Sequence, residues 1–310
     1  MTQKDKSPYA PLDWKDFFDT KRMVPISTDL DPSQLTFCVY ETNRNRTDVP
    51  LIVLHHGAGF CARSFATTAK ELKKLLGDQA RFLCYDVRGH GETTSNDQHN
   101  LHVERLAKDL QNLLLTLYGP GSGSDRMPEL FLVGHSMGGA VVVEFAAKEL
   151  ISGISAVAVL DMAEKMAMVN IKEWSETRPK TFDSVEQVVQ FGVETKVVRN
   201  LESARVSFPG LITHAPAPAS GYVWYTDLMA SEAYWATWFK NLNQKFLKIK
   251  APPKKILILA EYGKLDDELQ AAYEKGEFQL LIFDGAGHFV QEDQPVRMAK
   301  ELVDFWKQRT

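Results

Sequence analysis

Short apolar segments recur along this chain, and most of them are followed by a longer stretch with helical periodicity. Apolar residues are nearly continuous within most of these segments, which is typical of strands buried on both faces of a parallel sheet. One segment alternates apolar and polar residues instead, as an edge strand does. We predict the edge strand at 34–40 and the buried strands at 51–55, 81–86, 129–134, 154–160, 255–260 and 278–283.

Helical patterns lie between several of these strands, and we predict helices at 65–76, 101–117, 140–150 and 294–308. The second of them has a continuous apolar face, as an amphipathic helix does. That face carries Leu106, Leu110, Leu113 and Leu117. The alternation of strands and helices predicts an α/β fold with a doubly wound, mostly parallel sheet.

The region from 161 to 250 interrupts this alternation. It has no strong strand pattern, it is rich in aromatic residues, and a Pro-rich loop lies at 215–220. We predict a single domain over 1–310, with a mainly helical cap inserted between two strands at approximately 162–250. Most cap aromatics are expected to pack inside the cap. A few should face the active site, and Trp224 and Trp235 are our candidates for substrate binding.

Composition narrows the class of protein. The chain has 310 residues, 44% of them hydrophobic, and a formal net charge of −4, so nothing indicates binding to nucleic acid or to an anionic membrane. The cysteines are three in number and form no CxxC pair, which argues against a disulfide framework, a zinc site or any other metal site. No cofactor motif is present. Because the sequence shows neither a secretory signal nor a membrane span, we expect a cytoplasmic or nuclear protein.

The strongest motif is Gly-His-Ser-Met-Gly-Gly at 134–139, between the apolar strand at 129–134 and an apolar helix. This is the G-x-S-x-G pattern of a nucleophile elbow, in which a sharp strand-to-helix turn exposes the serine. The serine, Ser136, then lies at a helix N-terminus, where free backbone N–H groups favour developing negative charge. We predict that Ser136 is the nucleophile of a serine hydrolase with the α/β-hydrolase fold.

A serine hydroxyl needs a base, and His288 is the best candidate. It follows the last apolar strand, in a glycine-containing loop that can direct the imidazole toward Ser136. The base needs a carboxylate that orients it. Asp161 follows directly on a strand, whereas Asp266 and Asp267 lie several residues beyond one. We prefer Asp161, because a rigid strand end positions a side chain better than a loop does.

The oxyanion hole needs two backbone N–H donors. Met137 should supply one of them, because it follows the nucleophile. The loop His56-Gly57-Ala58-Gly59 resembles the HGGG-type loop that supplies the other, with Ala58 our first choice and Gly59 the second. The same loop makes His56 and Gly57 candidates for contact with the substrate.

Several segments together resemble one family, the protein phosphatase methylesterases. The resemblance covers nearly the whole chain and includes segments 7–14, 89–93, 134–139 and 160–161, together with 178–182, 199–207 and 234–239 of the cap. It implies that Ser136, Asp161 and His288 form the triad. It further implies hydrolysis of the methyl ester on the C-terminal leucine of the protein phosphatase 2A catalytic subunit, and a partner complex of this subunit with its scaffold.

Two other functions are compatible with these motifs. A small-molecule carboxylesterase or lipase shares the same fold and catalytic residues, since neither sets the substrate. A non-catalytic binding module on a hydrolase scaffold is the alternative of another class.

The cap arginines Arg178, Arg199 and Arg205 are either solvated or internally paired, or they contact an acidic partner surface or the new carboxylate. Of these, Arg178 and Arg205 are our candidates for substrate binding.

Overall fold

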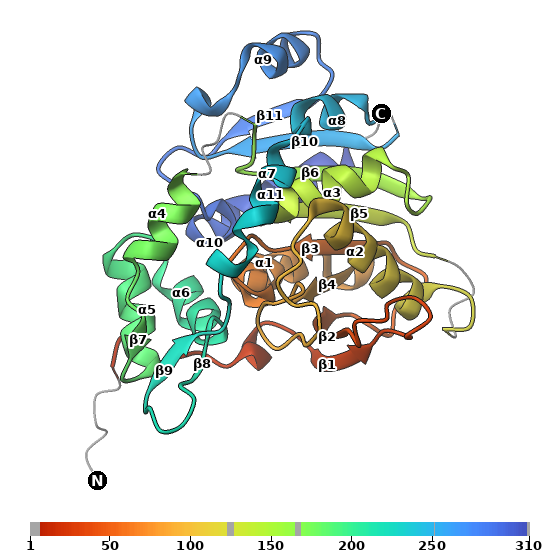
Figure 1. Cartoon of the computed structure of the whole chain (residues 1–310). Helices are drawn as coiled ribbons and strands as arrows, with labels where there is room; N and C mark the ends of the chain where they lie inside the picture. The colour runs from red at the N-terminus through yellow and green to blue at the C-terminus, as the bar shows by residue number, and fades with distance from the viewer. Residues whose placement is uncertain (1–6, 123–126, 165–168, 251, 309–310) are drawn as a thin grey trace.

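A mostly parallel sheet forms the centre of the molecule (Figure 1). The structure is a computed structural model, and it describes residues 7–122, 127–164, 169–250 and 252–308. β1 pairs antiparallel with β2 and β2 with β4, while the remaining neighbours are parallel. The predicted fold class is therefore confirmed. The sheet order is β1 (Thr20–Pro25), β2 (Thr36–Thr42), β4 (Arg81–Tyr85), β3 (Leu51–His55), β5 (Leu130–His135), β6 (Ile154–Leu160), β10 (Lys254–Leu259) and β11 (Gln279–Ile282).

Helices cover both faces of this sheet. α1 (Ala66–Leu76) packs against α11 (Pro295–Lys307) on one face, and α2 (Val103–Tyr118) packs against α3 (Met137–Ala147) on the other. Alternate residues of a strand point to opposite faces of the sheet. On β3, Ile52 and Leu54 belong to the hydrophobic core under α1 and α11, and Val53 belongs to the core under α2 and α3. Burial on both faces explains why these strands read as continuous apolar segments.

The edge of the sheet differs from the prediction. The segment at 34–40 was expected to be an edge strand, but β1 pairs with β2 and is itself the edge. β1 was missed because its sequence, TKRMVP, has a single buried residue, Val24. An edge strand that buries so little apolar surface leaves almost no hydrophobic pattern in the sequence.

The segment between β6 and β10 is mainly helical, as expected for the cap. It contains α4 (Val169–Thr177), α5 (Val185–Glu194), α6 (Leu201–Ser207), α7 (Glu232–Phe239) and α8 (Leu242–Lys248). It also contains a small antiparallel sheet that the sequence did not predict, in the order β7 (Thr181–Phe182), β9 (Tyr222–Trp224), β8 (Ile212–His214). These strands are too short for a periodic pattern. The bounds 162–250 stay our proposed limits of the cap.

The remaining helices are short. α9 (Asp267–Glu274) follows β10, and α10 (Val290–Asp293) precedes α11. The 3₁₀ helices are η1 (Trp14–Asp16), η2 (Ala62–Phe65), η3 (Gly77–Gln79), η4 (Phe208–Gly210), η5 (Met229–Ser231) and η6 (Tyr262–Lys264). Within the described ranges, no helix has both the length and the apolar character needed to cross a membrane. Cys38, Cys61 and Cys84 are buried and free.

Candidate active site

Ser136 lies in a tight turn between β5 and α3, where it is the N-cap of the helix. Its backbone is left-handed, with φ +52° and ψ −123°, a conformation that is uncommon for a non-glycine residue. The turn leaves no room for side chains around it. A Cβ at Gly134 would lie 2.2 Å from the Gly138 carbonyl oxygen, and one at Gly138 would lie 2.3 Å from the His55 carbonyl oxygen. The G-x-S-x-G spacing therefore has a steric cause.

His288 follows β11 and reaches the end of β6, where it meets Asp161. The His288 Nδ1–H donates to Asp161 Oδ2 over 2.7 Å. Asp161 is fully buried, and its Oδ1 accepts a second hydrogen bond from the Ala260 N–H at 2.8 Å. Because Nδ1 carries the proton in this pair, Nε2 of the neutral imidazole is left as an acceptor, as a general base requires.

The alternative carboxylate lies elsewhere. Asp266 is the N-cap of α9, where its Oδ1 accepts from the Leu269 N–H at 2.9 Å and its Oδ2 accepts from Asn243 Nδ2. Asp267 is the first residue of the same helix. Both carboxylates thus sit at the start of α9, and Asp161 is the one that the fold brings to His288.

Ser136 and His288 both face a cavity of about 620 Å³. It opens at the carboxyl ends of β3, β5, β6, β10 and β11, the edge of a parallel sheet at which ligands usually bind. The cap closes it from the other side. Within the described residues, no hydrogen bond joins Ser136 Oγ to His288. The distance between a nucleophile and its base often shortens to a hydrogen bond only when substrate binds. Apolar side chains supply much of the wall, namely Met162, Ile171, Trp174, Val197, Leu228, Phe239 and Phe289.

The proposed oxyanion donors lie beside the serine. In the part of the chain that the structure describes, the N–H groups of Met137 and Ala58 have no protein acceptor, and Ala58 lines the cavity. Gly59 is different, because its N–H donates to His90 Nε2 over 2.9 Å. The occupied N–H argues against our second choice, Gly59, and leaves Ala58 as the proposed donor of this loop.

Comparison with known proteins agrees with this arrangement. A model described as "Alpha/beta hydrolase family" matches residues 52–301. Protein phosphatase methylesterase 1 of Aspergillus oryzae is 37% identical over 321 residues, which cover 99% of this chain and 74% of the relative. The chain belongs to the protein phosphatase methylesterase family. The proteins of that name from Schizosaccharomyces pombe and Bos taurus are 35% and 30% identical, over 95% and 97% of this chain and 84% and 87% of theirs. As a member of this family the chain is an esterase of the hydrolase class.

Solved structures show the same fold at low sequence identity. An E-2-(acetamidomethylene)succinate hydrolase has a TM-score of 0.72 at 18% identity and covers 93% of this chain and 99% of its own. The thioesterase domain from the curacin biosynthetic pathway has a TM-score of 0.66 at 14% identity, over 92% of this chain and 99% of its own. At these identities the likeness supports the α/β-hydrolase fold and carries nothing about the substrate.

Two buried histidines hold the Ala58 loop in this methylesterase-family chain. His90 Nε2 accepts from the Gly59 N–H, and its Nδ1–H donates to the Arg88 carbonyl at 2.9 Å. His56 Nε2 accepts from the Val87 N–H at 2.9 Å, and its Nδ1–H donates to the Gly57 carbonyl at 2.8 Å. Burial lowers the pKa of His90 to about 4 and that of His56 well below its usual range, so both stay neutral.

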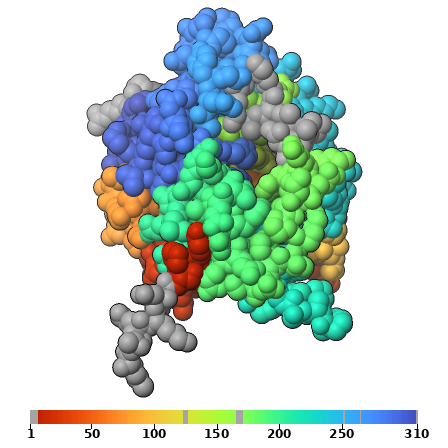
Figure 2. Space-filling model, turned by 90° about the vertical axis from the view of Figure 1, so that its left-hand side faces the viewer, coloured from red at the N-terminus to blue at the C-terminus, as the bar shows by residue number. Residues whose placement is uncertain are grey.

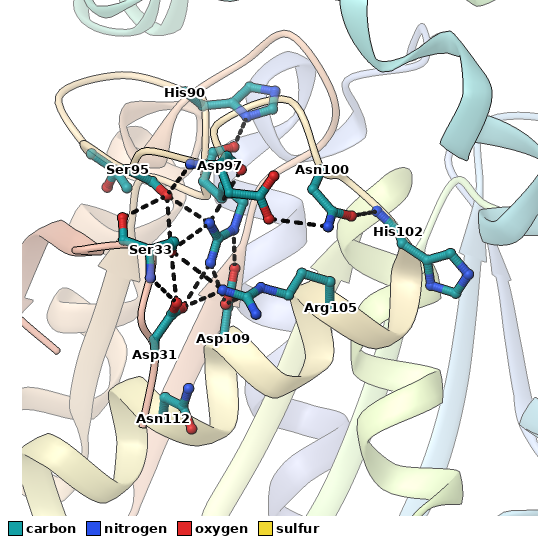
Figure 3. A network of polar contacts seen from close by, with 12 residues as sticks. Asp31, Ser33, His90, Ser95, Asp97, Asn100, His102, Arg105, Asp109 and Asn112 are labelled. Carbon is teal, nitrogen blue, oxygen red and sulfur yellow. Dashed lines mark hydrogen bonds and ion pairs between the residues drawn. The ribbon is translucent and has the colours of Figure 1, made fainter. Parts of the chain in front are cut away.

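A buried ionic network anchors the segment that carries His90. The Arg88 guanidinium is fully buried and binds both oxygens of Asp109 at 2.8 Å each, while its Nη2 also donates to Asp31 Oδ2 at 2.8 Å. Figure 3 shows Asp31, Arg105 and Asp109 converging below the loop of His90. The loop after β4 is thus fixed to helix α2, and it fixes the Ala58 loop in turn.

Most of the predicted substrate-binding residues lie outside the cavity, and only Gly57 lines it. His56 is fully buried under the loop. The Arg205 Nε–H donates to the Ala10 carbonyl at 2.6 Å and so holds the N-terminal segment. Trp235 is a core residue whose Nε1–H donates to Ser231 Oγ at 3.1 Å. A sequence pattern could not reveal these directions, since they depend on packing between distant elements.

Arg178 and Trp224 pack against each other behind the cavity wall. The Arg178 guanidinium lies between two rings, 4.4 Å from the centre of Trp224 and 4.7 Å from that of Trp174. Its Nη2 donates to the Thr226 carbonyl at 3.1 Å, and Arg178 as a whole is 7% exposed. Burial lowers the pKa of Arg178 to about 10. Trp174 therefore lines the cavity, whereas Arg178 and Trp224, which were predicted to bind the substrate, do not.

The lining residues that were absent from the predicted site include His135, Trp174, Lys196 and Arg199, of which Arg199 had been considered only as one of the three cap arginines. The Nε2–H of His135 donates to the carbonyl of His288 at 2.8 Å, so the residue before the nucleophile holds the backbone of the proposed base. The position of His135 inside the G-x-S-x-G motif was the available signal. No comparable local signal marks Trp174 or Lys196, because the cap brings them to the site.

Proposed function

We propose that this esterase hydrolyses the methyl ester on the C-terminal leucine of the protein phosphatase 2A catalytic subunit. The observation that carries the proposal is the His288–Asp161 pair, which faces Ser136 in an apolar cavity roofed by the cap. The printed name of the relatives, protein phosphatase methylesterase 1, supports the choice of substrate. The binding partner would be the catalytic subunit in complex with its scaffold.

The proposed reaction has two halves. Ser136 Oγ attacks the ester carbonyl while His288 Nε2 takes the hydroxyl proton, and Asp161 stabilises the imidazolium that forms. The N–H groups of Met137 and Ala58 would bind the oxyanion, a contribution of about 3–4 kcal/mol per donor in comparable enzymes. The imidazolium then protonates the leaving methoxide, and methanol departs. Water activated by His288 hydrolyses the acyl-enzyme, which releases the free carboxylate and regenerates Ser136.

The cavity suits this substrate in size and polarity. A methoxy leaving group needs little space on its side of the serine. The leucine side chain and the residues that precede it need apolar contacts, which Trp174, Phe239, Phe289 and their neighbours supply. Hydrolysis of a small ester would use the same atoms, so this chemistry alone does not select between a protein substrate and a small molecule.

The test is methanol release from carboxymethylated phosphatase 2A core enzyme, measured beside release from its isolated C-terminal peptide. We expect the wild type to demethylate the protein, and Ser136→Ala to reduce turnover by roughly 10⁴-fold or more without loss of binding. Near-wild-type turnover by a purified Ser136→Ala variant would disprove the nucleophile. Hydrolysis of short-chain esters without any methanol release would instead favour a small-molecule carboxylesterase.

Labelling with a serine-directed fluorophosphonate distinguishes the proposed esterase from the remaining alternative, a non-catalytic binding module. A non-catalytic binding module would bind the phosphatase but would not be labelled at Ser136. Labelling of the wild type, together with its loss in Ser136→Ala, would exclude that function.

A further inference from the structure

One buried carboxylate touches both the cap and the loop of His288. Asp293 ends α10, and its side chain is 2% exposed. Its Oδ2 accepts from the Gly287 N–H at 2.6 Å, one residue before His288. Its Oδ1 accepts from the backbone N–H of Arg199 in the cap at 2.7 Å. A single side chain therefore joins the two segments.

Arg199 completes this junction from the cap side. Its Nη1 lies 3.1 Å from Asp293 Oδ2, and its guanidinium packs so closely on Gly287 that a Cβ there would be 2.2 Å from Nη1. Burial raises the pKa of Asp293, while the hydrogen bond and the charge of Arg199 oppose that rise. The side chain of Arg199 is 43% exposed and also lines the cavity. Figure 2 shows the face of the molecule on which the green cap surface meets the blue C-terminal segment.

His288 is consequently held at three points. Asp161 binds its ring, His135 binds its carbonyl, and Asp293 binds the N–H of the residue before it. The first two hydrogen bonds come from residues of the central sheet, at the ends of β6 and β5. The third comes from a carboxylate that also binds the cap, through Arg199.

We propose that Asp293 and Arg199 are positioning residues that couple the cap to the placement of the His288 imidazole. The coupling rests on the proposed function, in which His288 is the base. Because Arg199 also borders the cavity, a group of the substrate that contacts it acts on the loop of His288 through Asp293. A shift of the imidazole by about 1 Å would change turnover by up to 10²-fold while leaving most substrate contacts in place.

Variants at these two positions test the coupling. Asp293→Ala removes both acceptors, whereas Asp293→Asn keeps one carbonyl oxygen for the two N–H donors. Arg199→Gln removes the guanidinium from Gly287 and leaves the carboxylate. The matched control is Glu202→Gln, which breaks the 3.0 Å ion pair between Glu202 on α6 and Lys70 on α1. This ion pair also joins the cap to a helix that packs on the central sheet, but it does not touch the loop of His288.

Turnover of p-nitrophenyl acetate, thermal unfolding and the imidazole NMR signals of His288 are measured for each protein. We expect Asp293→Ala to lower kcat by about 10- to 100-fold with KM within about threefold, and Asp293→Asn and Arg199→Gln to lower kcat less. The His288 signals should move in the same order. Glu202→Gln should retain the kcat and the NMR signals of the wild type.

Three results would overturn the proposal. The first is a folded Asp293→Ala protein with the kcat of the wild type. The second is a loss of equal size in Glu202→Gln, which would indicate general loosening of the cap. The third is His288 signals that do not move in Asp293→Ala. If the wild type hydrolyses no ester, the proposed function fails, and the His288 signals still decide whether Asp293 and Arg199 position that side chain.

Discussion

At the scale of the residue, the candidate site places two non-glycine residues in left-handed backbone. Ser136 has φ +52° and Asp161 has φ +46°, and each stands at the carboxyl end of a central strand. Such conformations cost of order 1–3 kcal/mol and persist only where the surrounding structure enforces them. Here backbone hydrogen bonds to the neighbouring strands hold both residues, from the Ser136 N–H to the Leu160 carbonyl at 3.0 Å and from the Asp161 N–H to the Ile258 carbonyl at 2.7 Å. Both side chains point to His288 or its cavity as a result.

The first prediction separates the two candidate carboxylates. Asp161→Asn should lower kcat by roughly 10³- to 10⁴-fold, because an amide stabilises neither the required His288 tautomer nor the imidazolium. Asp266→Asn should stay within about twofold of the wild type, since Asn caps a helix as well as Asp does. Steady-state kinetics on methylated peptide measure both. Similar, mild losses in the two variants would mean that neither carboxylate orients the base.

At the scale of the element, the loops that bear the site are fixed by side chains of other loops. His90 and His56 join the Ala58 loop to the loop after β4, and each needs an unprotonated Nε2 to accept its backbone N–H. Protonation of either imidazole would replace an acceptor with a donor. The geometry of the proposed oxyanion hole therefore requires neutral histidines, which burial provides.

This requirement gives a pH dependence of stability. Burial lowers the pKa of His90 to about 4, against about 6.5 in the unfolded chain, so the unfolded state binds more protons between these values. The contribution of His90 is complete above pH 6.5 and is lost as pH falls toward 4. Relative to His90→Gln, the wild type should lose up to about 1.4 kcal/mol of unfolding free energy per pH unit in that window. Urea unfolding at pH 7.5, 6 and 5 measures the difference, and a constant difference would refute it.

At the scale of the whole molecule, the site depends on contacts between segments far apart in sequence. The Arg88 network joins the segment before β2, the loop after β4 and helix α2. The cap adds Trp174 and Arg199 to a cavity whose floor comes from strand ends. Sheet, loops and cap must therefore assemble together before the cavity exists.

The corresponding prediction concerns the Arg88 network. Arg88→Met should lower the free energy of unfolding by about 3–5 kcal/mol, because it leaves Asp109 buried without the charge that it binds bidentately. Lys300→Gln breaks an exposed ion pair with Asp304 and should leave the unfolding midpoint unchanged. Chemical denaturation followed by circular dichroism measures both. An equally small change in Arg88→Met would show that the network contributes little to stability.

Much of the fold and the identity of the candidate nucleophile could be predicted from the sequence by itself. The strands at Leu51–His55 and Ile154–Leu160 have the predicted bounds, and α1 and α2 begin within two residues of the prediction. Buried parallel strands are apolar throughout, and amphipathic helices repeat with a fixed period, so both leave local patterns. The elbow around Ser136 is also marked by a local motif, although only the crowding of Gly134 by Gly138 is local and Gly138 itself is crowded by the distant His55 carbonyl.

Only the tertiary structure decided which distant residues meet. It brought Asp161 rather than Asp266 to His288, gave the Gly59 N–H to His90, and turned Arg205 and Trp235 away from the cavity. It also supplied Trp174 and Arg199 from the cap. The direction of a side chain and the partner of a backbone N–H depend on how separate elements pack. A periodic pattern along one element carries no information about that packing.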